Sequence, residues 1–214
     1  MIRNNPEPAS GIAAAAEWRL LGLLLERPRD TWLRDVASLA AEVQDPKLRA
    51  AAAAARDATE GVYLSLLGPG GAASPREVSC RSFEDPGKIL ADLRGFFDAF
   101  GFRPLAEDPL DHVAVETAFV SYLLLKEEFA RARGEGAAGE ITAAARQQFI
   151  ETHLAPLAAA FAERLSACGS GYLAEAARLL AERVPQVVPP AIIDADAAGL
   201  SGCGGCSLRG ALDA

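Results

Sequence analysis

Two acidic residues, a proline and a histidine lie close together at Asp108, Pro109, Asp111 and His112, just before an apolar run. As a helix start, Asp108 would cap the helix, Pro109 would take its first position, and the Asp111 carboxylate would meet free backbone amides in the first turn. His112 would then lie one turn before Glu116. The same polar helix end could accept donors from a bound peptide. Catalysis has less support, because no serine, cysteine or lysine nucleophile lies next to these residues in the sequence.

A second candidate is the segment Tyr63–Gly71, in which an aromatic residue and leucines precede a loop rich in glycine and proline. The loop is not a phosphate cradle, because it lacks the lysine and the hydroxyl residue that complete a P-loop. Two interpretations remain. The segment is either the last turn of a helix packed into the core, or an apolar groove edge that receives an extended or helical peptide.

The pair Cys203 and Cys206 near the C-terminus could bind one soft metal ion or form a small disulfide. A structural zinc site needs four ligands, however, and the other two cysteines, Cys80 and Cys168, lie far away in the sequence. We therefore expect no stable metal site. Transient metal handling, or a redox contact with a partner, stays open as an alternative function.

His153 lies three residues before Pro156 in an otherwise helical segment. Proline lacks a backbone N–H and clashes with the preceding turn, so we expect a kink or a break near Thr152. We interpret His153 as a structural residue that meets a backbone carbonyl freed by this break.

The whole sequence indicates one globular domain. It has 214 residues, of which 50% are hydrophobic and 23% charged, and a formal net charge of −8. This negative balance argues against nucleic-acid binding, and the absence of a long uncharged apolar run argues against a membrane span. The N-terminal segment resembles no signal peptide, and no two arginines are adjacent, so we expect a cytoplasmic protein.

Helical spacing of apolar residues recurs along the chain, and no alternating pattern of a β-strand stands out. Asp-Pro pairs at residues 45, 85 and 108 are typical helix starts, and Asp30 can cap another helix. We predict an all-α bundle over residues 11–184, an arm over 1–10 and a flexible tail over 185–214. The predicted helices cover residues 11–26, 31–43, 46–67, 86–100, 109–133, 139–166 and 172–183. Ile12 and Leu33 are expected on buried faces.

Several of these segments together resemble the TorD/DmsD/NarJ family of redox-enzyme maturation chaperones. Tyr63–Pro69 is similar to that family's aromatic-x-x-Leu-Phe-x-Gly-Pro motif, with Leu67 in place of the phenylalanine. Asp108–His112 resembles its Glu-Pro-x-Asp-His signature, and Phe149–Leu157 its Phe-x-x-x-His-Leu-x-Pro-Trp motif. Together with Phe100-Gly101 and Gly171-Tyr172-Leu173, the resemblance covers about residues 12–184 in the right order.

The resemblance implies a chaperone of the TorD-like fold, without a cofactor, that binds the apo catalytic subunit of a molybdenum enzyme before cofactor insertion. Many such chaperones also bind the twin-arginine signal peptide of that subunit. Carried over by motif, the residues that contact the client would be Tyr63, Leu66, Leu67 and Pro69, and Pro109, Asp111 and His112. The chain would be a monomer or a dimer with exchanged helices.

The sequence also yields one stability test and leaves two other classes of function. Replacing Asp111 or His112 by alanine should weaken client binding with little change in melting, whereas a collapse of melting would favour the capping interpretation. One alternative is a thiol- or metal-handling protein that acts through Cys203 and Cys206. The other is a small enzyme that uses His112 with a carboxylate, which would need a ligand-sized pocket.

Overall fold

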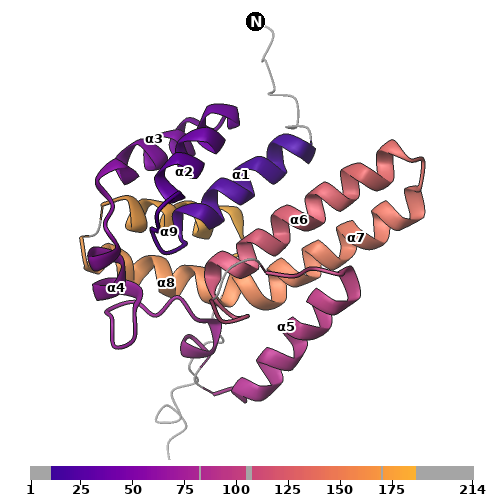
Figure 1. Ribbon diagram of the computed structural model, residues 1–214. Helices are drawn as coiled ribbons and strands as arrows, with labels where there is room; N and C mark the ends of the chain where they lie inside the picture. Colours follow the sequence, from indigo (N-terminus) through magenta and orange to yellow (C-terminus); the bar gives the residue numbers. More distant parts are fainter. Residues whose placement is uncertain (1–10, 82, 105–107, 170, 187–214) are drawn as a thin grey trace, which may run out of the picture.

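A computed structural model describes residues 11–81, 83–104, 108–169 and 171–186, and helices account for most of them (Figure 1). These ranges contain no β-strand, only an isolated antiparallel bridge between Arg76 and His112, which confirms the all-α prediction for the described part of the chain. Two short 3₁₀ turns cover Ala55–Asp57 and Glu77–Ser79. The α-helices are α1 (Gly11–Leu24), α2 (Trp32–Glu42), α3 (Pro46–Ala54), α4 (Glu60–Leu67), α5 (Pro86–Phe100), α6 (Val113–Ala132), α7 (Gly136–Phe149), α8 (Ala155–Ala167) and α9 (Gly171–Arg183).

The predicted arm and almost all of the predicted tail, including Cys203 and Cys206, lie outside the described residues. Pro185 and Gln186, which begin that tail, are described and are not helical. None of the described helices combines the length and the apolar character needed to cross a membrane.

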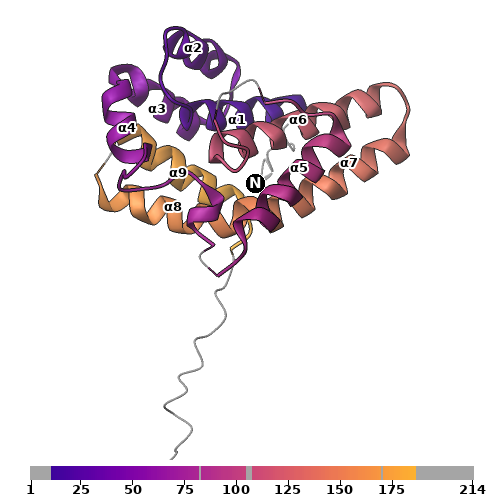
Figure 2. The same cartoon turned by 60° about the horizontal axis from the view of Figure 1, so that its bottom comes forward.

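Helix α6 lies at the centre of the bundle, packed between α1 and α7, while α8 and α9 form a second pair beside it (Figures 1 and 2). Phe119 of α6 meets Phe149 of α7 edge to face, with ring centroids 4.7 Å apart. Phe97 of α5 adds a third ring 4.8 Å from Phe119. The buried side chains of the described residues form one connected hydrophobic core, as expected of a single domain.

Two of the three predicted Asp-Pro helix starts are confirmed. The Asp45 carboxylate accepts a hydrogen bond from Lys47 N at 2.8 Å, and Asp85 accepts one from Gly87 N at 2.8 Å. Each carboxylate thus pairs an amide that has no partner within its own helix. Gly101 ends α5 with φ at 68°, a conformation that glycine adopts at little cost.

The prediction of one helix over residues 46–67 was wrong, because α3 ends at Ala54 and α4 begins at Glu60. Thr59 is extended, and its hydroxyl accepts a hydrogen bond from Val62 N at 3.3 Å, which makes it the N-cap of a separate helix. Helix α2 also starts differently from the expectation. Its N-cap is Thr31 rather than Asp30, and no side chain caps it.

The predicted break near Thr152 is confirmed as a π-helical turn, Ile150–Leu154, between α7 and α8. Pro156 cannot donate to the carbonyl of Thr152, four residues earlier. Arg81 supplies the missing donor, with its Nη1 at 2.9 Å from that carbonyl oxygen. His153 was expected to take this part, but its Nδ1 lies instead 3.0 Å from a carboxylate oxygen of Glu77.

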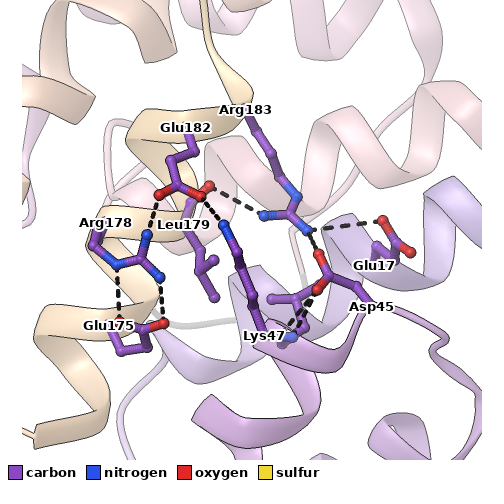
Figure 3. Close-up of polar contacts among 9 residues, drawn as sticks. Glu17, Asp45, Lys47, Glu175, Arg178, Leu179, Glu182 and Arg183 are labelled. Carbon is purple, nitrogen blue, oxygen red and sulfur yellow. Dashed lines mark hydrogen bonds and ion pairs between the residues drawn. The ribbon is translucent and has the colours of Figure 1, made fainter.

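Charged side chains join the end of α9 to α1 and α3 (Figure 3). Arg183 contacts the Asp45 carboxylate and lies 3.8 Å from that of Glu17. Lys47 pairs with Glu182 at 3.0 Å. The N-cap of α3 therefore also holds the last turn of α9, so segments far apart in the sequence close one side of the bundle.

Candidate functional site

Helix α6 begins at Val113, and His112 is its N-cap. The His112 ring accepts a hydrogen bond at Nδ1 from Ala114 N, at 3.1 Å. The prediction that Asp108 caps this helix and Pro109 starts it was therefore wrong. Residues 109–112 instead form a turn in front of the helix, closed by a 3.0 Å bond from His112 N to the Pro109 carbonyl.

The turn in front of α6 is held by the loop that follows α4. Val113 N donates to the Pro75 carbonyl, and Glu77 N to the Asp111 carbonyl, each at 2.9 Å. The fully buried Asp111 carboxylate pairs with Arg76, at 2.8 Å from Nε and 2.7 Å from Nη2. This pairing keeps His112 extended, so no helical turn can begin before it.

The two segments that the sequence singled out meet at Tyr63 and His112. The Tyr63 hydroxyl lies 3.1 Å from His112 Nε2 and 3.3 Å from the Leu25 carbonyl oxygen. Because His112 Nδ1 accepts from a backbone amide, the ring proton is on Nε2 and is donated to the Tyr63 oxygen. The Tyr63 hydroxyl in turn donates a hydrogen bond to the Leu25 carbonyl oxygen. Burial lowers the pKa of His112 and so favours this neutral ring.

Three fully buried carboxylates lie near this helix start: Asp111, Glu77 and Glu116. Glu77 is paired, because Arg81 and His153 both contact it. Neither carboxylate oxygen of Glu116 has a hydrogen-bond partner among the described residues. Burial, with the negative charge of Glu77 as a smaller cause, raises the pKa of Glu116 well above its ordinary value. A carboxyl group in this position is stable in its protonated form.

A groove of about 1070 Å³ lies on the outer side of the contact between α1 and α6. The two helices approach closely at Gly22, where a Cβ atom would lie 3.3 Å from the Ala114 carbonyl oxygen. The groove is lined by apolar residues from four elements: Ala15 and Leu23 of α1, Trp32 and Leu39 of α2, Phe102 and Pro104 of the loop after α5, and Ala118, Tyr122 and Leu125 of α6. Its volume is at the upper end of the usual range for small-molecule pockets, and suits a peptide segment.

Charges of both signs surround this apolar lining. Arg19, Arg27, Arg29 and Arg103 line the groove together with Glu26, Asp35 and Asp108, so the groove itself has no excess of carboxylates. Most of these charges already have partners. Arg19 pairs with Glu26 at 2.5 Å, Arg27 with Glu60, and Arg103 with Asp98 at 2.9 Å. Asp108 also lines the groove, and it has no ion-pair partner among the described residues.

The seven residues predicted to contact a client are not equally accessible. Tyr63, Leu67, Asp111 and His112 are buried, Leu66 is half-buried, and Pro69 and Pro109 are exposed. None of the seven lines the groove, although Asp108 of the same motif does. That these residues contact a client stays a prediction; as the molecule stands, the polar atoms of Asp111 and His112 are engaged inside it.

A groove between α1, α2 and α6 was not predicted from the sequence. Ile12 was expected in the core but is 61% exposed and lines the groove. Leu33 of α2, also expected to be buried, is 43% exposed. Leu125 is 49% exposed and lies on the side of α6 that faces the groove. One signal was available, since α6 has apolar residues on more than one face, and a helix can use its second apolar face for binding as well as for burial.

The described cysteines form no metal or disulfide site. Cys80 and Cys168 are free, and Arg164 lies 3.6 Å from the sulfur of Cys80, whose pKa is raised by burial. Among the described residues no three His, Cys, Asp or Glu side chains are grouped so that they could hold a metal ion. The alternative function based on Cys203 and Cys206 concerns residues outside this part of the chain.

Comparisons with known proteins support the fold and identify the family. The sequence model of the nitrate reductase delta subunit family matches residues 33–163, which is more than half of the chain. The fold resembles the crystal structure of a protein from Archaeoglobus fulgidus described as a redox enzyme maturation protein, with a TM-score of 0.54 and 16% sequence identity over 78% of this chain and 91% of the other. No curated protein matches the sequence. The chain belongs to the nitrate reductase delta subunit family, the NarJ/TorD family of non-catalytic redox-enzyme maturation chaperones.

Proposed function

We propose that this chaperone binds the apo catalytic subunit of a molybdenum oxidoreductase of the dimethyl-sulfoxide-reductase superfamily before its cofactor is inserted, and that the groove receives an apolar segment of that client. The observation that carries this proposal is the apolar groove of about 1070 Å³ with charges at its rim. An isolated chain gains nothing from exposing Ile12 and Leu125 to water, whereas a peptide with an apolar middle would cover both.

We further propose that this segment is the twin-arginine signal peptide of the client. Such a peptide combines a basic end with an apolar stretch. Asp108 lines the groove and offers a carboxylate without an ion-pair partner among the described residues. A guanidinium group can pair with such a carboxylate at two points. The exposed Pro69 and Pro109 would contact the client outside the groove, and the buried members of the two motifs would support the loops that line the groove.

The client is tested by affinity purification of the tagged chain from its own host under anaerobic conditions, followed by mass spectrometry. We expect one molybdenum-enzyme catalytic subunit, mostly without cofactor. In cells shown to express such an enzyme, the recovery of no such subunit would contradict the proposal.

The signal-peptide proposal is tested with two synthetic peptides, a twin-arginine signal sequence from that client and the same sequence with glutamines in place of the arginines. We expect the wild-type chain to prefer the arginine peptide, and Asp108→Asn to lose most of this preference. Asp57→Asn is the matched control, because Asp57 is exposed and does not line the groove. Equal binding of the two peptides by the wild-type chain would argue against the charge contact.

A further inference from the structure

Two loops that are far apart in the sequence contribute to the lining of the groove. The α1–α2 loop contributes Glu26, Arg27 and Arg29, and the α5–α6 loop contributes Phe102 to Pro104 and Asp108. Both loops lead into further parts of the lining, since α2 follows the first and α6 follows the second. The relative position of these loops therefore affects the shape of the groove.

His112 fixes the second loop to the start of α6. Its ring accepts from Ala114 N at 3.1 Å, and its carbonyl oxygen accepts from Val115 N at 2.8 Å and Glu116 N at 3.0 Å. Ala114 and Val115 line the groove. The ring of His112 therefore ends the α5–α6 loop and positions the first groove residues of α6.

Tyr63 connects this helix start to the first loop. Its hydroxyl accepts a hydrogen bond from His112 Nε2, at 3.1 Å, and donates one to the Leu25 carbonyl oxygen, at 3.3 Å. Leu25 directly precedes Glu26 and Arg27, whose side chains line the groove. Glu60, one turn before Tyr63 on α4, also pairs with Arg27. Helix α4 is thus bonded to both loops.

The hydrogen bonds run in one direction only. Because Nδ1 is an acceptor, His112 can only donate a hydrogen bond from Nε2. Tyr63 must accept that bond and can therefore only donate its own to the Leu25 carbonyl oxygen. Removing the Tyr63 hydroxyl leaves the cap of α6 intact but breaks this hydrogen-bonded link between the two loops. Replacing His112 by asparagine keeps a good N-cap residue, but its shorter side chain does not reach Tyr63.

We propose that Tyr63 and His112 are positioning residues, and that their hydrogen bond couples the α1–α2 and α5–α6 loops into the shape that binds the client peptide. Neither residue touches the peptide; each acts through the loop to which it is bonded. The identity of the peptide rests on the proposed function, whereas the coupling of the loops does not.

The test compares Tyr63→Phe, His112→Asn and the double variant in two measurements. In the first, each single variant should bind the twin-arginine peptide about three- to tenfold more weakly, the usual effect of one lost hydrogen bond. The double variant should bind no more weakly than the weaker single variant, because both substitutions break the same connection. Fully additive losses would overturn the coupling.

In the second measurement, hydrogen exchange of the free protein should become faster in residues 25–31 and 108–118 of both single variants. Tyr172→Phe is the control, because the buried Tyr172 hydroxyl has no hydrogen-bond partner among the described residues. It should leave peptide affinity and exchange in both loops unchanged, and it should not lower the melting temperature, because it removes no hydrogen bond. Unchanged exchange in Tyr63→Phe would overturn the coupling of the loops. If the wild-type chain does not bind the peptide, only the signal-peptide proposal is lost, and the exchange measurement still tests the coupling.

Discussion

At the scale of single residues, the polar groups of the two motifs serve mainly to hold each other in place. His112 caps α6 and meets Tyr63, and Asp111 pairs with Arg76 from a fully buried position. Both interpretations considered for the sequence, capping and binding, therefore concern the same residues. His112 rather than Asp108 caps the helix, and in our proposal these residues affect binding through the loops that they join.

Asp111 permits a direct test of its structural part. We expect Asp111→Ala to lower the free energy of unfolding by about 2 kcal/mol, because Arg76 loses a buried charged acceptor. This prediction differs from the expectation from the sequence that melting would hardly change. Asp98→Ala is the control, since its pair with Arg103 is exposed on both sides and such pairs contribute about 0–1 kcal/mol. Urea unfolding of the two variants measures the difference. Equal losses in the free energy of unfolding would contradict a stabilising role of the Asp111–Arg76 pair.

Glu116 gives a prediction about pH. Its raised pKa means that the folded chain keeps a proton that the unfolded chain releases above its ordinary pKa, so stability must fall as pH rises through this window. The slope approaches about 1.4 kcal/mol per pH unit between the two pKa values. Glu116→Gln should remove this part of the slope, because the amide never ionises.

The measurement for Glu116 is the free energy of unfolding at several pH values between 5 and 8. His112 changes stability in the opposite direction, since its lowered pKa costs stability as pH falls, but both chains contain it and the effect cancels in the difference. Glu163→Gln is the control, because Glu163 is exposed. A constant difference between Glu116→Gln and the wild type across this range would contradict a protonated Glu116.

At the scale of elements, local signals predicted most helices and failed where the cause was remote. Asp45 and Asp85 are followed by proline and cap their helices as predicted, because a cap needs only its own next residues. The same pattern at Asp108 failed, since the loop of Arg76 pairs with the backbone there and delays the helix. The partner of the Thr152 carbonyl, Arg81, is 71 residues away, so no local pattern could identify it.

Arg81 accordingly provides the prediction at this scale. It pairs with the buried Glu77 and with the carbonyl that Pro156 leaves free. Arg81→Met keeps the aliphatic part of the side chain but removes both contacts, together with the pair to the half-exposed Glu84, and we expect a loss of about 3 kcal/mol or more. Arg178→Met, on the exposed face of α9, should cost about 1 kcal/mol or less although it removes contacts to two carboxylates. Thermal unfolding compares them; similar losses would show that the π-helical turn does not depend on Arg81.

At the scale of the whole molecule, the groove is a product of packing and not of any one segment. Its lining includes residues from Ile12 of α1 to Leu125 of α6, and no single segment of the sequence contains enough of them to indicate a groove. The sequence could predict the two motifs that meet at Tyr63 and His112, since each is contiguous. It could not predict that apolar residues of α1, α2 and α6 would face the same groove, because that depends on how the helices cross.

The net charge of −8 gives the last prediction, which concerns the rate of binding. The groove has charges of both signs, so the attraction for a basic peptide must come mainly from the field of the whole chain. We expect the association rate constant of the twin-arginine peptide to fall several-fold between about 50 and 500 mM salt, with little change in the dissociation rate constant. The apolar contacts that hold the bound peptide are not screened by salt.

Stopped-flow fluorescence measures both the association and the dissociation rate constant. The peptide with glutamines is the control and should associate at a rate that depends less on salt. Equal salt dependence for the two peptides would show that the negative charge of the chain does not guide its client.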